Sequence, residues 1–174
     1  MEPLERSLRD VINQGAAQLV QGLRNLRAKS RQARRPIIFM AHSLGGLIVQ
    51  RALIIAREAR DLPSRDIYVA VRGVMYFGVP GPCSSIERLQ GVLADISRIA
   101  GLAEVDPELE KGVRDLESFS ADAKALVEMM KAYEGIGDRL HSVSACFSET
   151  LPTVTPSGPI VSYSRPGGGG CPCS

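Results

Sequence analysis

The chain has 174 residues, 44% of them hydrophobic and 23% charged, with a formal net charge of +2. This size and composition predict one soluble domain with a buried core. The small net charge excludes an electrostatic argument for a nucleic-acid partner. The longest apolar runs are too short for a transmembrane helix, and the charged, amphipathic N-terminus does not resemble a secretion signal, so we expect an intracellular protein.

Apolar residues recur at three- and four-residue steps from Leu4 to Leu26, which predicts an amphipathic helix packing one face on a sheet. The apolar run Ile37 to Met40 predicts a parallel strand buried on both faces, with helices on both sides of the sheet. A basic cluster separates the two segments. It either complements the end of the helix and keeps the loop solvated, or binds a phosphate or lipid headgroup. Its members are Arg24, Arg27, Lys29, Arg31, Arg34 and Arg35.

A second helix is expected to follow and to reach about Arg60, closed by Asp61-Leu62-Pro63. The segment Ile67 to Val71 is compatible with either strand or helix. The run Gly73 to Phe77 predicts the next central strand, because the Gly/Pro-rich segment Gly78 to Pro82 cannot continue it. Its end should lie on the same rim of a parallel sheet as the end of the first strand.

Three amphipathic helices are then predicted in a helical insertion over residues 83–135, as a cap over the rim or as an extra layer on one face. Strands are predicted over Ser142 to Phe147 and Pro159 to Tyr163. The fold class is therefore α/β, with a mostly parallel sheet of about four strands flanked by helices. The domain should cover residues 1–164, and the Gly/Pro/Cys-rich tail 165–174 should be disordered.

The four cysteines are Cys83, Cys146, Cys171 and Cys173. Without a secretion signal, free thiols are the default, and Cys146 lies in a strand expected to be buried. Cys171-Pro172-Cys173 lacks the second pair of ligands that a zinc site needs. We therefore predict neither a metal nor another cofactor.

The strongest motif is Ala41-His42-Ser43-Leu44-Gly45, between the first predicted strand and the helix after it. It matches the nucleophile elbow G-x-S-x-G, with alanine in the first position. Small residues at Ala41, Gly45 and Gly46 would let the strand and helix backbones approach, and the Leu44 N–H would stabilise an oxyanion. The alternative is that Ser43 only caps the helix.

A nucleophilic serine also needs a base and an acid. His42 should point away from Ser43, and His141 begins a strand, about 20 Å from the rim at roughly 3.3 Å per residue. Glu149 follows the end of that strand and is either the acid or a solvated loop carboxylate. No histidine follows Glu149 in the chain, so a base in the usual Ser-acid-His order is missing.

Three blocks carry a family resemblance: RPIIFMAHSLGGLIVQRAL, GVMYFGVPG and SVSACFSETLPT. They resemble lipase-like α/β-hydrolases and, more narrowly, the serine-active-site-containing hydrolase family, which also forms the N-terminal module of many fungal nucleotide-binding and ankyrin-repeat proteins. The resemblance implies a partial α/β-hydrolase fold and an esterase or lipase acting on an ester or lipid-like small molecule. Ser43 would be the nucleophile and Glu149 the acid. Val79 and Gly81 stand where the family has threonine and histidine.

The family's histidine follows the third block, and its opening strand and His-Gly loop precede the first helix, so we expect the domain to be incomplete at both ends. The strand Ile37 to Met40 would then have an open edge, through which we expect self-association. Two functions stay open: an incomplete serine hydrolase domain, or a catalytically inactive hydrolase-like module for interaction or regulation.

Overall fold

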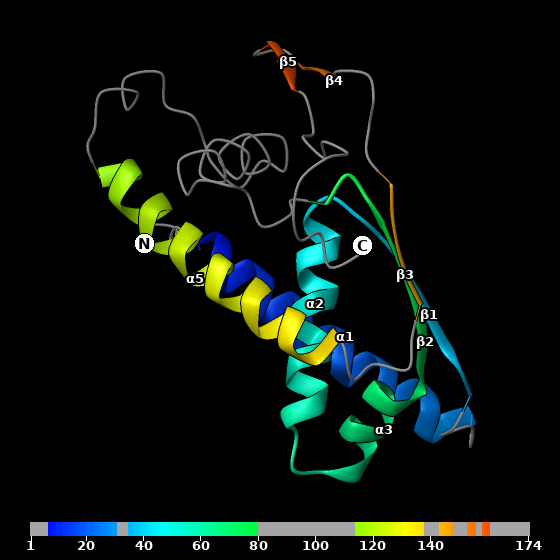
Figure 1. Ribbon diagram of the computed structural model, residues 1–174. Helices are drawn as coiled ribbons and strands as arrows, with labels where there is room; N and C mark the ends of the chain where they lie inside the picture. The colour runs from blue at the N-terminus through cyan, green and yellow to red at the C-terminus, as the bar shows by residue number, and fades with distance from the viewer. Residues whose placement is uncertain are drawn as a thin grey trace.

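Three parallel strands form a sheet whose described helices all lie on one face (Figure 1). The computed structural model describes residues 7–30, 35–79, 114–137, 143–147, 153–155 and 158–160. Its elements are α1 (Leu8–Ser30), β1 (Ile37–His42), α2 (Leu44–Glu58), α3 (Leu62–Ala70), β2 (Val71–Phe77), α5 (Arg114–Gly137), β3 (Val143–Phe147), β4 (Thr153–Thr155) and β5 (Gly158–Ile160).

The strand order in the sheet is β1-β2-β3, so consecutive described strands are neighbours. Met40 lies opposite Met75, which lies opposite Ala145, and the last rung joins His42, Phe77 and Phe147. All three strands therefore end at one rim, as the sequence predicts. The short strands β4 and β5 form a separate antiparallel pair.

Local sequence signals set the helix boundaries. The Ser7 side chain accepts a hydrogen bond from the Asp10 N–H at the start of α1. Asp61 does the same for the Ser64 N–H at the start of α3, where Pro63 occupies the first turn. That hydrogen bond lowers the pKa of the Asp61 carboxyl below its ordinary value.

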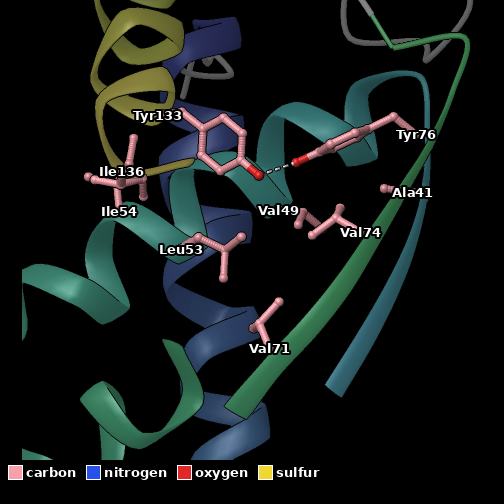
Figure 2. Packing of buried hydrophobic residues seen from close by; sticks show 9 residues of the cluster. All are labelled: Ala41, Val49, Leu53, Ile54, Val71, Val74, Tyr76, Tyr133 and Ile136. Atoms are coloured by element: carbon pink, nitrogen blue, oxygen red, sulfur yellow. Dashed lines mark hydrogen bonds between the residues drawn. The ribbon is translucent and has the colours of Figure 1, made fainter. Parts of the chain in front are cut away.

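One cluster of the core lies between the sheet and helices α2 and α5 (Figure 2), and two further clusters lie among the helices. Leu53 from α2 and Val74 from β2 are almost fully buried there. The phenol of Tyr76 donates a hydrogen bond of 2.8 Å to the phenol of Tyr133, and their rings meet edge to face. This pair joins β2 to α5, so the last helix of the predicted insertion is fixed to the central strand of the sheet.

The expectation that β1 is buried on both faces is wrong. Ile37, Phe39 and Ala41 face the helices, but Ile38 and Met40 on the other face are 66% and 71% exposed. No described helix covers that face, so the prediction of helices on both sides of the sheet is also wrong for the described part of the chain. An unbroken apolar strand indicates that both faces could be buried, whereas the covering elements come from elsewhere in the fold.

Three helix predictions need correction as well. Helix α1 packs mainly on α2 and α3 rather than directly on the sheet. Asp61-Leu62-Pro63 does not only end the preceding helix but begins α3, which continues over Ile67 to Ala70. The second and third helices predicted in the insertion are one continuous helix from Arg114 onward, and the first lies outside the described residues.

The sheet has three described parallel strands rather than about four, because the last predicted strand pairs antiparallel in β5. Cys146 is exposed and disulfide-bonded, so the expectation of a buried free thiol is wrong there. None of the helices in the described part of the chain is long and apolar enough to cross a membrane. The tail 165–174 lies outside the described residues.

Candidate functional site

Ser43 occupies the sharp turn between β1 and α2 in an unusual backbone conformation. Its φ is 49° and its ψ is −127°, and it is the only non-glycine residue with positive φ among those described. Such a conformation costs about 1–3 kcal/mol in an L-residue and persists only where the surroundings impose it. The Ser43 side chain makes no capping hydrogen bond, so the interpretation of Ser43 as a simple helix cap does not hold.

Backbone hydrogen bonds tie this turn to the ends of the neighbouring strands. The Ser43 N–H donates to the Phe77 carbonyl at 2.9 Å, and the Gly78 N–H donates to the Phe147 carbonyl at 3.0 Å. Gly78 has a φ of 53°, which turns the chain away from β2. The ends of all three strands are therefore held together at one rim, with Ser43 partly exposed on it.

The first turn of α2 supplies N–H groups next to Ser43. The Gly46 N–H closes the turn on the Ser43 carbonyl at 3.0 Å. The Leu44 N–H finds no acceptor among the described residues, as is usual for the first N–H groups of a helix. A free N–H at a helix N-terminus, adjacent to a serine, can stabilise negative charge on a ligand oxygen.

The need for a small residue lies at Gly46 rather than at Gly45. A Cβ atom on Gly46 would overlap with Cγ2 of Val79, whereas a Cβ on Gly45 would meet nothing within 4 Å. Ala41 is buried at the end of β1 among core residues. The steric reason given for Gly45 is therefore wrong, whereas Gly46 does lie at a close contact, with the Val79 side chain.

Val79 has a role that the sequence did not reveal. It follows the end of β2, packs on the clusters that contain Ala41 and Leu47, and covers the first turn of α2 at Gly46. In the sequence Val79 is only a departure from the family pattern. The glycine pair Gly45-Gly46 indicates a close contact, but nothing in the sequence names the partner.

The remaining predicted catalytic residues are not brought to Ser43 by the described structure. His42 is exposed at the end of β1, as expected for a residue on the opposite side of the strand from Ala41. Glu149 and His141 lie outside the described residues, so their roles stay predictions. The structure thus places Ser43, Leu44 and Gly46 together and leaves the base and the acid unassigned.

Two described members of the basic cluster, Arg24 and Arg27, make contacts with nearby residues. Arg24 pairs with Asp61 at 3.6 Å, and Arg27 donates to the Arg35 carbonyl at 2.7 Å. These contacts favour the interpretation that the cluster closes the end of α1. Arg31 and Arg34 lie outside the described residues, and within those described no three potential ligand side chains gather as they would around a metal ion.

Comparison with known proteins gives one distant match. The chain is similar to protein SERAC1 of Bos taurus, with 28% identity over 130 residues. The matched region covers 70% of this chain but only 19% of that protein, so the chain spans about a fifth of the relative's length. No family model and no solved structure matches the chain. The described architecture is a mixed α/β arrangement with a small parallel sheet.

Proposed function

We propose that this chain carries the nucleophile-bearing part of a serine hydrolase domain of the esterase or lipase type. The observation that supports this most is the conformation of Ser43, with φ at 49° between a parallel strand and a helix. That strained strand-turn-helix arrangement is the context in which G-x-S-x-G presents a nucleophile. The distant similarity to SERAC1 and the three family-like blocks support the same family.

In this proposal the Ser43 Oγ attacks the carbonyl carbon of an ester, and its proton passes to a general base. The Leu44 N–H donates to the oxyanion that forms, and loss of the alcohol leaves an acyl group on Ser43 that water then removes. Glu149 would be the acid that orients the base. The substrate is an ester or lipid-like small molecule, as the resemblance implies.

A second function is supported by a separate observation. Among the described residues no histidine side chain is placed as a partner for Ser43, since His42 is the only one described and is exposed at the strand end. A fold that keeps the elbow without a base would serve as a hydrolase-like interaction or regulatory module. Self-association through the β1 edge, expected from the incomplete sheet, stays a prediction.

The test is covalent labelling with a fluorophosphonate together with turnover of an activated ester. We expect wild type to be labelled and Ser43→Ala to lose label, with turnover falling by about 10³-fold or more. Ser30→Ala is the matched control, because Ser30 is an exposed serine at the end of α1 and should leave both signals unchanged.

Label that persists in Ser43→Ala would contradict the assignment of the nucleophile. Absence of label and turnover in a wild-type chain that is folded by circular dichroism would overturn the hydrolase proposal for this chain and support the interaction module. Glu149→Gln tests the acid: turnover should fall while labelling slows.

A further inference from the structure

Positive side chains gather at the end of the molecule where the strands of the sheet begin. Segment 21–35 carries six lysines and arginines and no aspartate or glutamate, although the net charge of the whole chain is only +2. The rest of the chain is therefore net negative. Because one short segment concentrates charge of one sign, it creates a positive surface that the small net charge conceals.

This segment lies beside α3 and the first residues of β2 (Figure 1). Arg24 on α1 pairs with Asp61 at the start of α3 at 3.6 Å. Arg27 donates to the Arg35 carbonyl at 2.7 Å, and the first rung of the sheet joins the start of β1 to the start of β2. We call this surface the basic end. Its described basic residues are Arg24, Arg27, Lys29, Arg35, Arg65 and Arg72.

The outer face of α3 combines apolar and positive side chains within the basic end. Leu62 and Val69 are seven residues apart, and therefore on one side of the helix, and they are 71% and 65% exposed. Arg65 lies between them on that side and is exposed as well. The Arg72 guanidinium donates to the Val69 carbonyl at 2.6 Å, which places a second positive charge beside Val69. Within α3 the only carboxylate is that of Asp66.

We propose that the basic end docks on the surface of an anionic lipid bilayer, with α3 lying along it. Leu62 and Val69 enter the boundary between headgroups and acyl chains, and the arginines beside them contact lipid phosphates. Exposed apolar side chains flanked by positive charge are the combination by which helices bind at a membrane interface. This inference does not rest on the chemistry of Ser43, which lies at the opposite end of β1.

The contacts of the cluster within the molecule do not cancel its charge. The carbonyl that Arg27 binds carries no net charge, and Asp61 balances one arginine. Closing the end of α1 is therefore compatible with binding an anionic surface. A nucleic acid fits the basic end less well, because it would use the positive charge but not the exposed apolar pair. Leu62 and Val69 offer no aromatic ring on which bases could stack.

Flotation of the full chain with lipid vesicles tests this inference. Wild type should bind vesicles that contain about a third phosphatidylserine, and should bind pure phosphatidylcholine vesicles at least about tenfold more weakly. Binding should fall as NaCl is raised from about 50 to about 500 mM, because salt screens the attraction between the arginines and the anionic headgroups.

A matched pair of charge variants assigns the electrostatic part of the contact. Each positive residue near an anionic membrane surface strengthens binding about fivefold, so Lys29→Gln/Arg65→Gln should weaken it about 20-fold. Lys124→Gln/Lys131→Gln removes two exposed lysines of α5 and gives the same net charge. This control should leave binding unchanged, because its lysines lie outside the basic end.

A second matched pair assigns the apolar part. Leu62→Gln/Val69→Gln keeps every charge and should weaken binding to the anionic vesicles about tenfold, because the two side chains no longer enter the interface. Ile38→Gln/Met40→Gln is the control, since these residues are 66% and 71% exposed on β1, and it should leave binding unchanged.

Equal binding to neutral and anionic vesicles, or binding to neither, would overturn the inference. Equal losses in the two charge variants would overturn it too, because binding would then follow net charge alone. Binding that resists Leu62→Gln/Val69→Gln would overturn the docking of α3. A chain that binds duplex DNA but not anionic vesicles would assign the basic end to a nucleic acid instead. All substituted side chains are exposed, and circular dichroism checks that each variant folds.

Discussion

At the scale of single residues, the elbow depends on a strained serine and on a glycine that permits a close contact. The Ser43 N–H is held by the Phe77 carbonyl, and Gly46 leaves room for Val79 on the first turn of α2. Both partners come from the end of β2 and the residues directly after it. The positive φ of Ser43 is therefore imposed by hydrogen bonding and packing around it, and not by a preference of serine itself.

The two adjacent glycines of the elbow should respond oppositely to alanine. Gly46→Ala forces its Cβ onto Val79 and should lower the free energy of unfolding by about 1–3 kcal/mol. Gly45→Ala meets open space within the first turn of α2 and should raise it by about 0.5–1 kcal/mol. Urea denaturation of the two variants measures both changes.

Val79→Ala is the control for this prediction. If the overlap with Val79 causes the loss, the double variant Gly46→Ala/Val79→Ala should lose less than the sum of the two single changes. Strictly additive losses would show that Gly46 is required for another reason.

At the scale of elements, a buried hydrogen bond joins a helix to a strand. The phenol of Tyr76 in β2 donates to the phenol of Tyr133 in α5. Burial raises the pKa of the Tyr76 phenol above its ordinary value, and the neighbouring Tyr133 adds to the shift. Burial likewise raises the pKa of Tyr133.

Both phenols should therefore make stability fall at alkaline pH. A tyrosine of the unfolded chain ionises near pH 10, while the folded pKa values lie higher, so folding favours the protonated phenols. Their contribution is complete below about pH 10 and is lost as pH rises above it, by at most about 1.4 kcal/mol per pH unit for each phenol. Urea denaturation at several alkaline pH values measures the loss.

The double variant Tyr76→Phe/Tyr133→Phe separates this effect from other alkaline titrations. Its stability should depend less steeply on pH above about pH 10 than that of wild type. Equal slopes in the two proteins would contradict the assignment of the buried phenols.

At the scale of the whole molecule, the sheet has one covered face and one open face. Val74 faces α2 and α5 and is fully buried, whereas Met40 one strand away is 71% exposed. The distribution of helices in Figure 1 produces this asymmetry. It distinguishes the described fold from a parallel sheet enclosed on both sides.

A lysine should therefore be tolerated on one face and not on the other. Met40→Lys should change the free energy of unfolding by less than about 0.5 kcal/mol, because its ammonium group stays in water. Val74→Lys should cost more than about 3 kcal/mol, because it buries an unpaired charge in the core. Thermal and urea unfolding at low protein concentration compare the two; similar costs would show that both faces of the sheet are covered.

The strands and the elbow were largely predictable from sequence because their signals are local. The apolar runs of β1, β2 and β3 and the Gly/Pro stop after Phe77 are contained within a few residues each. The predictions failed where a contact from elsewhere decides the outcome, as for the face of β1 and the disulfide of Cys146. They also failed at α3, because Asp61-Leu62-Pro63 begins a helix, and at α5, because two predicted helices form one continuous helix.

The sequence by itself determined that a serine stands between an apolar strand and a helix, with small residues beside it, because these are patterns of neighbouring residues. Only the tertiary structure decided that Val79 is the partner of Gly46, that Tyr76 meets Tyr133, and that one face of the sheet is open. Each of these depends on residues far apart in the chain. Such contacts are fixed by packing in three dimensions, which no local pattern encodes.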